Sequence, residues 1–188
     1  NTFGMNMIPP AMAIFSSILK KRGHNVEIFD STYYAVDFGL DSDGSQVEKL
    51  AVLPFDMGER GIRLKTSAWQ DDVKNQVNRF KPDLIALSTT EDMWELGVTI
   101  LQQLKEYKIE NKVPVIAGGV FPTFAPEIVS KENLIDLVCV GEGENALVDL
   151  CEKIQNKKDY SDLTNCWVKK NGKVIHKNRV SKPVNINE

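Results

Sequence analysis

Residues 83–90, with the sequence Asp-Leu-Ile-Ala-Leu-Ser-Thr-Thr, decide the fold class of this chain of 188 residues. The stretch is almost wholly apolar before its three hydroxyl residues, as is typical of a strand whose two faces are both covered in a parallel sheet. Three further runs predict strands, one upstream and two downstream: 26–30, 113–117 and 134–140.

Helical patterns, in which apolar side chains recur every three or four residues, alternate with these strands. The first helix begins near Pro10, because proline suits a first helical turn, and ends at Gly23, a natural stop. Later helices are expected at 71–80, 94–104, 125–131 and 146–154. This alternation predicts an α/β fold with a doubly wound, mainly parallel sheet, flavodoxin-like or Rossmann-like, joined by right-handed crossovers.

The last part of the chain differs from the rest. Two strand-like runs, 166–169 and 173–176, flank Asn171-Gly172, which is a strong signal for a β-hairpin. The polar residues after the hairpin have the composition of a linker. We therefore expect an α/β domain at 1–160, followed by a hairpin and linker at 161–188.

Two stretches near the start of the chain lack a clear pattern. Residues 1–10 are loop-like and lead straight into a helix, where a doubly wound sheet ordinarily has its first central strand. Either residues 2–7 form a poor version of that strand, or the strand lies upstream of Asn1, and we favour the second alternative. Residues 31–67 are expected to form a long loop insertion, with a short helix near 46–50. A loop of this length is often a lid or a partner surface.

Composition narrows the class of protein. The chain has 42% hydrophobic and 26% charged residues, and its net charge of −3 with scattered lysines gives no basic stripe for nucleic acid. No apolar run approaches the roughly 20 residues that span a bilayer, and no signal peptide opens the chain, so we expect a cytoplasmic protein. The three cysteines match neither a zinc nor an iron–sulfur motif, and their odd number argues against a disulfide framework.

Polar residues and glycines follow three of the predicted strands. Open α/β sheets bind ligands outside the carboxyl ends of their strands, and glycines there allow close approach by a bulky group. The candidate cofactor-binding residues are Ser88, Thr89, Thr90 and Glu91 in the first loop, Gly118, Gly119, Val120 and Thr123 in the second, and Gly141, Glu142 and Gly143 in the third.

Each of these strand-end loops also has a purely structural interpretation. Hydroxyl residues after a strand are often helix caps, a Gly-Gly pair permits a tight turn, and glutamates complement a helix dipole. One loop alone favours the structural interpretation. Three at successive strand ends favour a ligand.

With these loops in place, the chain resembles the cobalamin-binding domain of cobalamin-dependent radical SAM enzymes. Residues 10–30 resemble the first helix and second strand of that domain, and 83–90 its third strand. Residues 115–123 are similar to its fourth strand and glycine loop, and 136–144 to its fifth strand with the Gly-Glu-Gly-Glu helix start. The hairpin also has a counterpart in the family, where it leads toward the catalytic barrel.

The resemblance implies a corrinoid lying across the strand ends. Its nucleotide tail would pass over Gly118 and Gly119, with Ser88 and Thr90 available for polar contacts, and the loop with Asn6 and Ile8 would approach the corrin face. The corrinoid motif D-x-H-x-x-G supplies a histidine to cobalt, but residues 56–61 mimic it without histidine. We therefore expect base-off cobalamin with no histidine ligand and no metal-ligating residue from the protein.

The resemblance further implies a methyl transfer or a related radical reaction. The motif C-x-x-x-C-x-x-C, which holds the [4Fe–4S] cluster that cleaves S-adenosylmethionine, is absent from this sequence. We expect the cluster, S-adenosylmethionine and all catalytic residues in a following barrel of the same polypeptide, so that this chain alone is not a catalyst. A methyltransferase is the expected whole enzyme.

Other functions compete with this one. A dinucleotide-binding domain would use Asp30 for a ribose, but the motif G-x-G-x-x-G is not found. A phosphoacceptor receiver domain needs an acidic cluster at its strand ends, where Ser88 and Gly118 stand instead. A recognition module that keeps the fold without cobalamin is the alternative outside enzymes.

Overall fold

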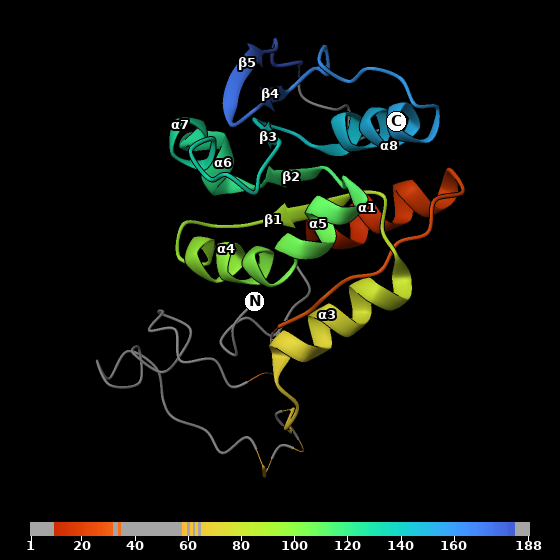
Figure 1. Ribbon diagram of the computed structural model, residues 1–188, viewed down its shortest axis with the longest axis vertical. Coiled ribbons are helices and arrows are strands. Elements are labelled where there is room, and N and C mark those ends of the chain that lie inside the picture. Colours follow the sequence, from red (N-terminus) through yellow and green to blue (C-terminus); the bar gives the residue numbers. More distant parts are fainter. Residues whose placement is uncertain are drawn as a thin grey trace.

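The fold is built around one sheet of five strands, seen in a computed structural model that describes residues 10–31, 34, 58–59, 61, 63 and 65–182. Strands β1 (Ile85–Ser88), β2 (Val115–Gly118) and β3 (Leu137–Cys139) run parallel, and β4 (Cys166–Lys170) and β5 (Lys173–Lys177) follow antiparallel, in the order β1-β2-β3-β4-β5 (Figure 1). The prediction of an α/β fold with a C-terminal hairpin is confirmed.

Helices cover both faces of this sheet (Figure 1). On one face, α1 (Pro10–Lys21) and α8 (Glu144–Gln155) pack Leu19 and Leu150 against Leu137 of the central strand. Because neighbouring residues of a strand point to opposite faces, Val138 contributes to the core on the other side. This arrangement explains why the strands are apolar at almost every position.

The opposite face is covered by α4 (Trp94–Gln103) and by two short helices, α6 (Val120–Phe124) and α7 (Pro126–Val129). Leu101 and Val129 pack there against Val115 and Ala117 of β2. Helices α3 (Trp69–Phe80) and α5 (Lys105–Asn111) complete this layer, with Leu104 between α4 and α5 packed on Val73 of α3.

The predicted strand at 26–30 is wrong. Within the described residues this segment has no strand partner, and it lies instead along α3. Glu27 accepts hydrogen bonds from Arg79 Nη2 at 2.7 Å and from Gln76 Nε2 at 3.1 Å, and Gln76 also donates to the Ile28 carbonyl at 3.3 Å. A strand needs a backbone ladder, whereas these contacts of the segment with α3 are made by side chains and reach one backbone group, the Ile28 carbonyl.

Two helix boundaries also differ from expectation. The helix expected at 94–104 is α4, which ends at Gln103 because Leu104 leaves helical geometry at φ −99° and ψ 2°. A further helix that was not predicted, α5, follows directly after it. The helix expected at 125–131 is α7, and it is preceded by α6, which occupies residues assigned from the sequence to the glycine loop. Residues 120–124 show no helical pattern of apolar side chains, so α6 was not predicted. The prolines Pro122 and Pro126 are nevertheless compatible with both helices, because proline is well accepted in a first turn.

The hairpin follows its sequence signal. Asn171 and Gly172 both have positive φ, 52° and 74°, as the favoured two-residue hairpin turn requires. The ladder between β4 and β5 shifts register between Val168 and Lys169. Since β4 pairs with β3, the hairpin extends the same sheet.

Most of the expected loop at 31–67 lies outside the described residues, as do the possible helix at 46–50 and the candidates Asn6 and Ile8. Within the described part, Tyr34 and Lys65 form an isolated parallel bridge. None of the described helices combines the length and the apolar character needed to cross a bilayer.

Replacing Leu137, which is fully buried at the centre of the sheet, tests this account of the core. Leu137→Ala leaves a cavity between α1, α8 and the sheet, and should lower the free energy of unfolding by about 2–5 kcal/mol. Ile109→Ala, at a position with 61% exposure, is the matched control and should change it by less than about 0.5 kcal/mol. Chemical denaturation followed by circular dichroism measures both, and equal effects would refute the proposed core.

Candidate functional site

Three strand-end loops meet at the carboxyl edge of the parallel strands: residues 88–91, 118–123 and 141–143. Ser88 lies opposite Gly118 in the register of β1 and β2, and the Thr89 amide continues the ladder by donating to the Gly118 carbonyl at 3.0 Å. β2 and β3 are paired in turn, so the third loop emerges beside the second. The sheet therefore brings together the three groups of residues predicted from the sequence.

Gly119 turns the chain from β2 into α6. Its φ of 104° is unfavourable for residues with a side chain, and an ideal Cβ there would lie 2.7 Å from the Thr89 oxygen and 2.9 Å from the Thr89 nitrogen. The Phe121 amide then donates to the Thr89 carbonyl at 3.3 Å. The space that this glycine leaves is thus filled by the protein's own backbone.

Gly118 has a different role from Gly119. Among the described residues, a Cβ on Gly118 would meet the Cβ of Cys139, at 3.4 Å, which is an ordinary contact. The turn therefore requires a glycine at position 119, whereas position 118 has room for a small side chain.

Thr123 joins the second loop to the third. Its hydroxyl donates to the Gly119 carbonyl at 2.8 Å and accepts from the Gly141 amide at 3.1 Å. A single side chain on α6 therefore sets the spacing between two strand ends.

The third loop is held from below by Asn165, which the sequence analysis missed. The Asn165 side chain is buried, donates to the Glu142 carbonyl at 2.7 Å, and accepts from the Ser181 amide at 2.6 Å. Its backbone carbonyl accepts from Val140 at 2.7 Å. The signal that the sequence offered was an Asn directly before a predicted strand. In the structure this Asn has a φ of 64°, which asparagine tolerates well.

Helix α1 closes the site beside the start of α8. A Cβ on Gly143 would lie 3.2 Å from Cζ of Phe15, so a glycine here lets the two helices approach. Next to it, Oε2 of Glu144 is buried and has no hydrogen-bond partner among the described residues. A buried carboxylate oxygen without a donor is costly, and this one marks a place where a donor is missing.

The candidate residues differ in exposure. Ser88, Glu91, Val120, Gly141 and Glu142 are exposed, and Val120 is 60% exposed although it is apolar. Thr89 is buried and donates to the Thr90 carbonyl at 2.8 Å, and Thr90 donates to the Asp92 carboxylate. The two threonines therefore brace the first loop.

The two histidines lie away from this edge. His24 follows α1 and its amide donates to the Leu19 carbonyl at 3.1 Å, whereas His176 lies on β5 opposite Val168. In the part of the chain that the structure describes, no three His, Cys, Asp or Glu side chains gather in a way that could hold a metal ion.

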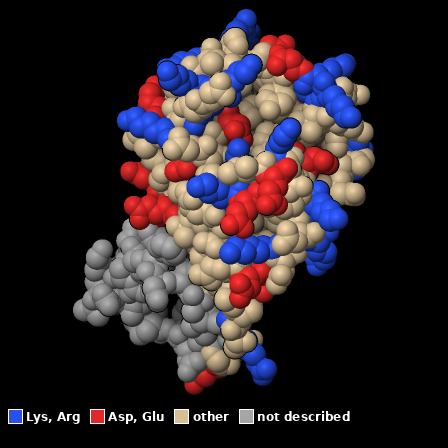
Figure 2. All heavy atoms as spheres, viewed as in Figure 1, with Lys and Arg blue, Asp and Glu red and all other residues tan. Residues whose placement is uncertain are grey.

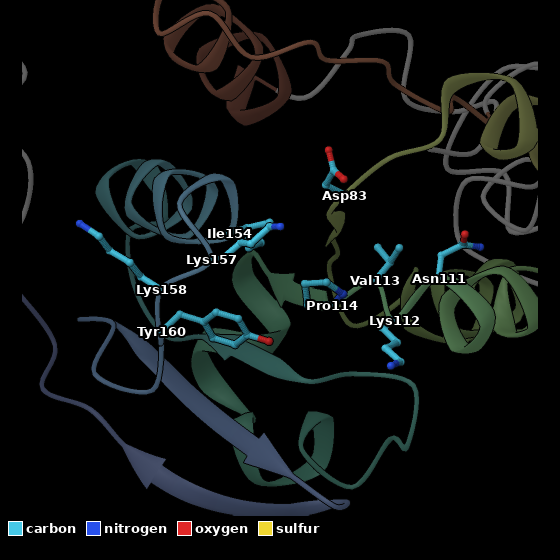
Figure 3. A pocket seen from close by; sticks show the side chains of 9 residues that line it. All are labelled: Asp83, Asn111, Lys112, Val113, Pro114, Ile154, Lys157, Lys158 and Tyr160. Carbon is cyan, nitrogen blue, oxygen red and sulfur yellow. The ribbon is translucent and has the colours of Figure 1, made fainter.

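A hollow lies at the end of the sheet opposite these loops. This cavity of about 360 Å³ is bounded by the starts of β1 and β2 and the end of α8, and Tyr160 reaches into it (Figure 3). Burial raises the pKa of Tyr160, and nearby Asp136 and Asp159 raise it further. Its lining residues are Asp83, Asn111, Lys112, Val113, Pro114, Ile154, Lys157, Lys158 and Tyr160.

Two of the three lysines that line this hollow stabilise helix ends. Lys112 is the C-cap of α5, and Lys157 follows the end of α8, so both place positive charge at the negative ends of helices. On the face shown in Figure 2, basic and acidic side chains are interspersed. The strand-end loops remain the better candidate site.

Gly119→Ala tests the backbone contact on which the site is built. The added Cβ combines a strained φ with a clash against Thr89, and should lower the free energy of unfolding by about 2–4 kcal/mol. Gly118→Ala is the neighbouring control and should cost less than about 1 kcal/mol. Thermal and urea unfolding of both variants would contradict the geometry if Gly118→Ala were the more damaging.

The stretch that carries the three loops matches a known family. Residues 54–151 match the family model of the B12 binding domain. No curated protein sequence matches the chain.

Solved structures share the fold. The radical S-adenosylmethionine methyltransferase TsrM from Kitasatospora setae, with tryptophan substrate and a SAM analog bound, has a TM-score of 0.64 and 16% identity over 96% of this chain. The cobalamin-dependent S-adenosylmethionine radical enzyme OxsB, with aqua-cobalamin and S-adenosylmethionine bound, has a TM-score of 0.53 and 23% identity over 70% of this chain.

This chain corresponds to 28% of the TsrM chain and 19% of the OxsB chain, so it matches one part of much longer proteins. At such low identity the likeness establishes a shared fold. The family model covers more than half of the chain, including β1, β2, β3 and all three strand-end loops. The chain belongs to the B12-binding domain family.

Proposed function

We propose that this chain binds cobalamin across the carboxyl ends of β1, β2 and β3, in base-off form, as the cofactor-carrying domain of a radical SAM enzyme. The observation that carries the proposal is the convergence of three strand-end loops in a chain of the B12-binding family. Open α/β sheets place their ligands at this edge.

The chemistry of the loops suits a corrinoid, a flat apolar macrocycle with amide groups at its rim. Val120 offers an exposed apolar side chain directly after β2, while the exposed Ser88 and Glu91 belong to the loop after β1. Glu144 Oε2, which has no partner among the described residues, would accept a hydrogen bond from a rim amide. Gly118 adds no side chain at the end of β2, and Gly143 lets α1 pack close to the third loop.

The remaining candidates act indirectly in this proposal. Gly119, Thr89 and Thr123 fix the relative positions of the first two loops, while Gly141 and Glu142 set the third. Asn6 and Ile8 are proposed to approach the corrin from the loop before α1. Since neither His24 nor His176 lies at this edge, cobalt would have no histidine ligand.

Bound cobalamin supplies a cobalt centre that carries a methyl group or takes part in radical chemistry. The residues of this chain would hold and orient it. The structures of TsrM and OxsB belong to enzymes that their descriptions call a methyltransferase and a cobalamin-dependent radical enzyme. By that analogy, residues 1–160 are the carrier domain, and residues 161–188 lead to a barrel of the same cytoplasmic polypeptide with the [4Fe–4S] cluster and S-adenosylmethionine.

A second candidate function is recognition of a protein partner without cobalamin. It is favoured by the apolar side chains that α6 and α7 present to solvent, since Phe124 is 84% and Ile128 is 52% exposed. Exposed apolar side chains that lie together often mark interaction surfaces. The two functions are separated by whether the protein takes up cobalamin.

Reconstitution tests the proposal directly. The full-length protein, incubated with hydroxocobalamin and then desalted, should retain the absorption spectrum of a base-off corrinoid. Histidine ligation would give a different spectrum. A colourless protein with native circular dichroism would refute cobalamin binding and favour the recognition module.

Val120→Asp tests where the corrinoid lies. A carboxylate at this exposed apolar position should weaken cobalamin binding about tenfold or more, because the charge loses water when the macrocycle covers it. Ile109→Asp places the same charge at a similarly exposed apolar position on α5, far from the strand ends, and should leave affinity unchanged. Titration followed by absorbance measures both, and equal affinities would place the corrinoid elsewhere.

A further inference from the structure

Cys139 and Cys166 face each other across β3 and β4. They are direct partners in the antiparallel register. The hydrogen bonds Val140 N to Asn165 O, at 2.7 Å, and Lys169 N to Asp136 O, at 2.8 Å, belong to alternate pairs of this ladder. The cysteines therefore occupy a non-hydrogen-bonded pair, in which facing side chains approach most closely, with Cα atoms about 4.5 Å apart.

This spacing is compatible with a disulfide, which requires Cα atoms roughly 4.4–6.8 Å apart. Both side chains point to the α1 and α8 face, where Cys139 is 4% and Cys166 is 0% exposed. The Cys139 and Cys166 thiols lie close enough to perturb each other's pKa. The interaction with Cys166 lowers the pKa of Cys139 against the opposing effects of burial and Glu144. The interaction with Cys139 raises the pKa of Cys166, and burial raises it further.

The pair lies directly beneath the third strand-end loop. The Cys139 thiol is 3.8 Å from the Glu142 carbonyl, and a Cβ on Gly143 would be 3.7 Å from the same sulfur. The Glu142 carbonyl also accepts a hydrogen bond from the Asn165 amide. The state of the Cys139 sulfur therefore decides one of the contacts that hold this loop.

We propose that Cys139 and Cys166 form a redox-active thiol pair, which a peroxide oxidises to a cross-strand disulfide beneath the loop 141–143. Cys139 is the thiol that meets the oxidant, because it contacts the exposed loop while Cys166 is fully buried. Local opening of this loop is the shortest route for a small oxidant.

The reaction consumes one peroxide. The Cys139 thiolate attacks an oxygen of the peroxide, the O–O bond breaks, and hydroxide leaves, which gives a sulfenic acid. The Cys166 sulfur loses its proton and attacks the sulfenic sulfur, forming the S–S bond and releasing a second hydroxide. The two thiol protons and two hydroxides yield two waters, and the two electrons of the thiol pair reduce the peroxide.

The consequence of oxidation is local. A disulfide has no S–H, so the Glu142 carbonyl loses the Cys139 donor and keeps the Asn165 amide. This link to the strand-end loops rests on the proposed cobalamin function, whereas formation of the disulfide does not. A corrinoid over the loop should limit its opening and so protect the pair.

The test is oxidation of the native full-length protein with hydrogen peroxide, followed by blocking of free thiols and peptide mapping. A peptide pair joined through Cys139 and Cys166, lighter by two hydrogens, is expected. Cys151→Ser is the matched control and should still form it, since Cys151 is a separate thiol whose pKa burial raises to about 11. Cys166→Ala should abolish the linked peptides and leave oxidised Cys139 instead.

Separate sulfinic acids, a link through Cys151, or thiols that stay reduced until the protein unfolds would overturn the proposal. Mapping of the unsubstituted protein distinguishes these outcomes even if Cys166→Ala fails to fold. Cyanocobalamin at about ten times its dissociation constant should slow the disulfide about tenfold. If the protein binds cobalamin but forms the disulfide at an unchanged rate, only the proposed protection by cobalamin is overturned. If the protein stays colourless after reconstitution but still forms the disulfide, the proposed cobalamin function is refuted and the proposed thiol pair stands.

Discussion

The backbone of Gly119 passes so close to Thr89 that an ideal Cβ would lie 2.7 Å from the Thr89 oxygen, and the geometry of the site depends on this approach. It turns the chain at the end of β2 and directs the Phe121 amide toward the Thr89 carbonyl. It also starts α6 in the orientation that lets Thr123 reach both Gly119 and Gly141. Three strand ends are thereby held in fixed relation by one glycine and one threonine.

The same edge of the sheet is supported from beneath by side chains that belong to the hairpin side of the fold. Asn165 precedes β4, yet its amide holds the Glu142 carbonyl, and Cys139 of β3 contacts the same oxygen. Because β4 pairs directly with β3, the hairpin is mechanically part of the site. A change in the thiol pair or in the hairpin would therefore reach the strand-end loops through short, identifiable contacts.

The sequence predicted the elements whose signals are local. Residues 85–88, 115–118 and 137–139 are apolar enough to identify buried strands, and Asn171-Gly172 identifies the hairpin. The segment 26–30 was misassigned because its alternation of apolar and polar residues describes extended backbone equally well without a strand partner. Whether such a segment joins a ladder depends on its neighbour, which here is α3.

Within the candidate site, sequence reasoning found the three loops and missed what joins them. Thr123 was a candidate as a ligand contact, but its bonds to Gly119 and Gly141 depend on how α6 packs. Asn165 lies far along the chain from Glu142, so only the pairing of β3 with β4 brings them together. The buried Glu144 oxygen is likewise a property of the approach of α1 to α8.

Hydrogen exchange of the full-length protein with and without cobalamin tests the central claim, that the ligand lies at the carboxyl ends of β1, β2 and β3. We expect slower exchange on binding in peptides that contain 88–91, 118–123 and 141–143, and unchanged exchange in 111–114 and 157–160 at the opposite end of the sheet. Protection confined to 111–114 and 157–160 would contradict this placement of the ligand.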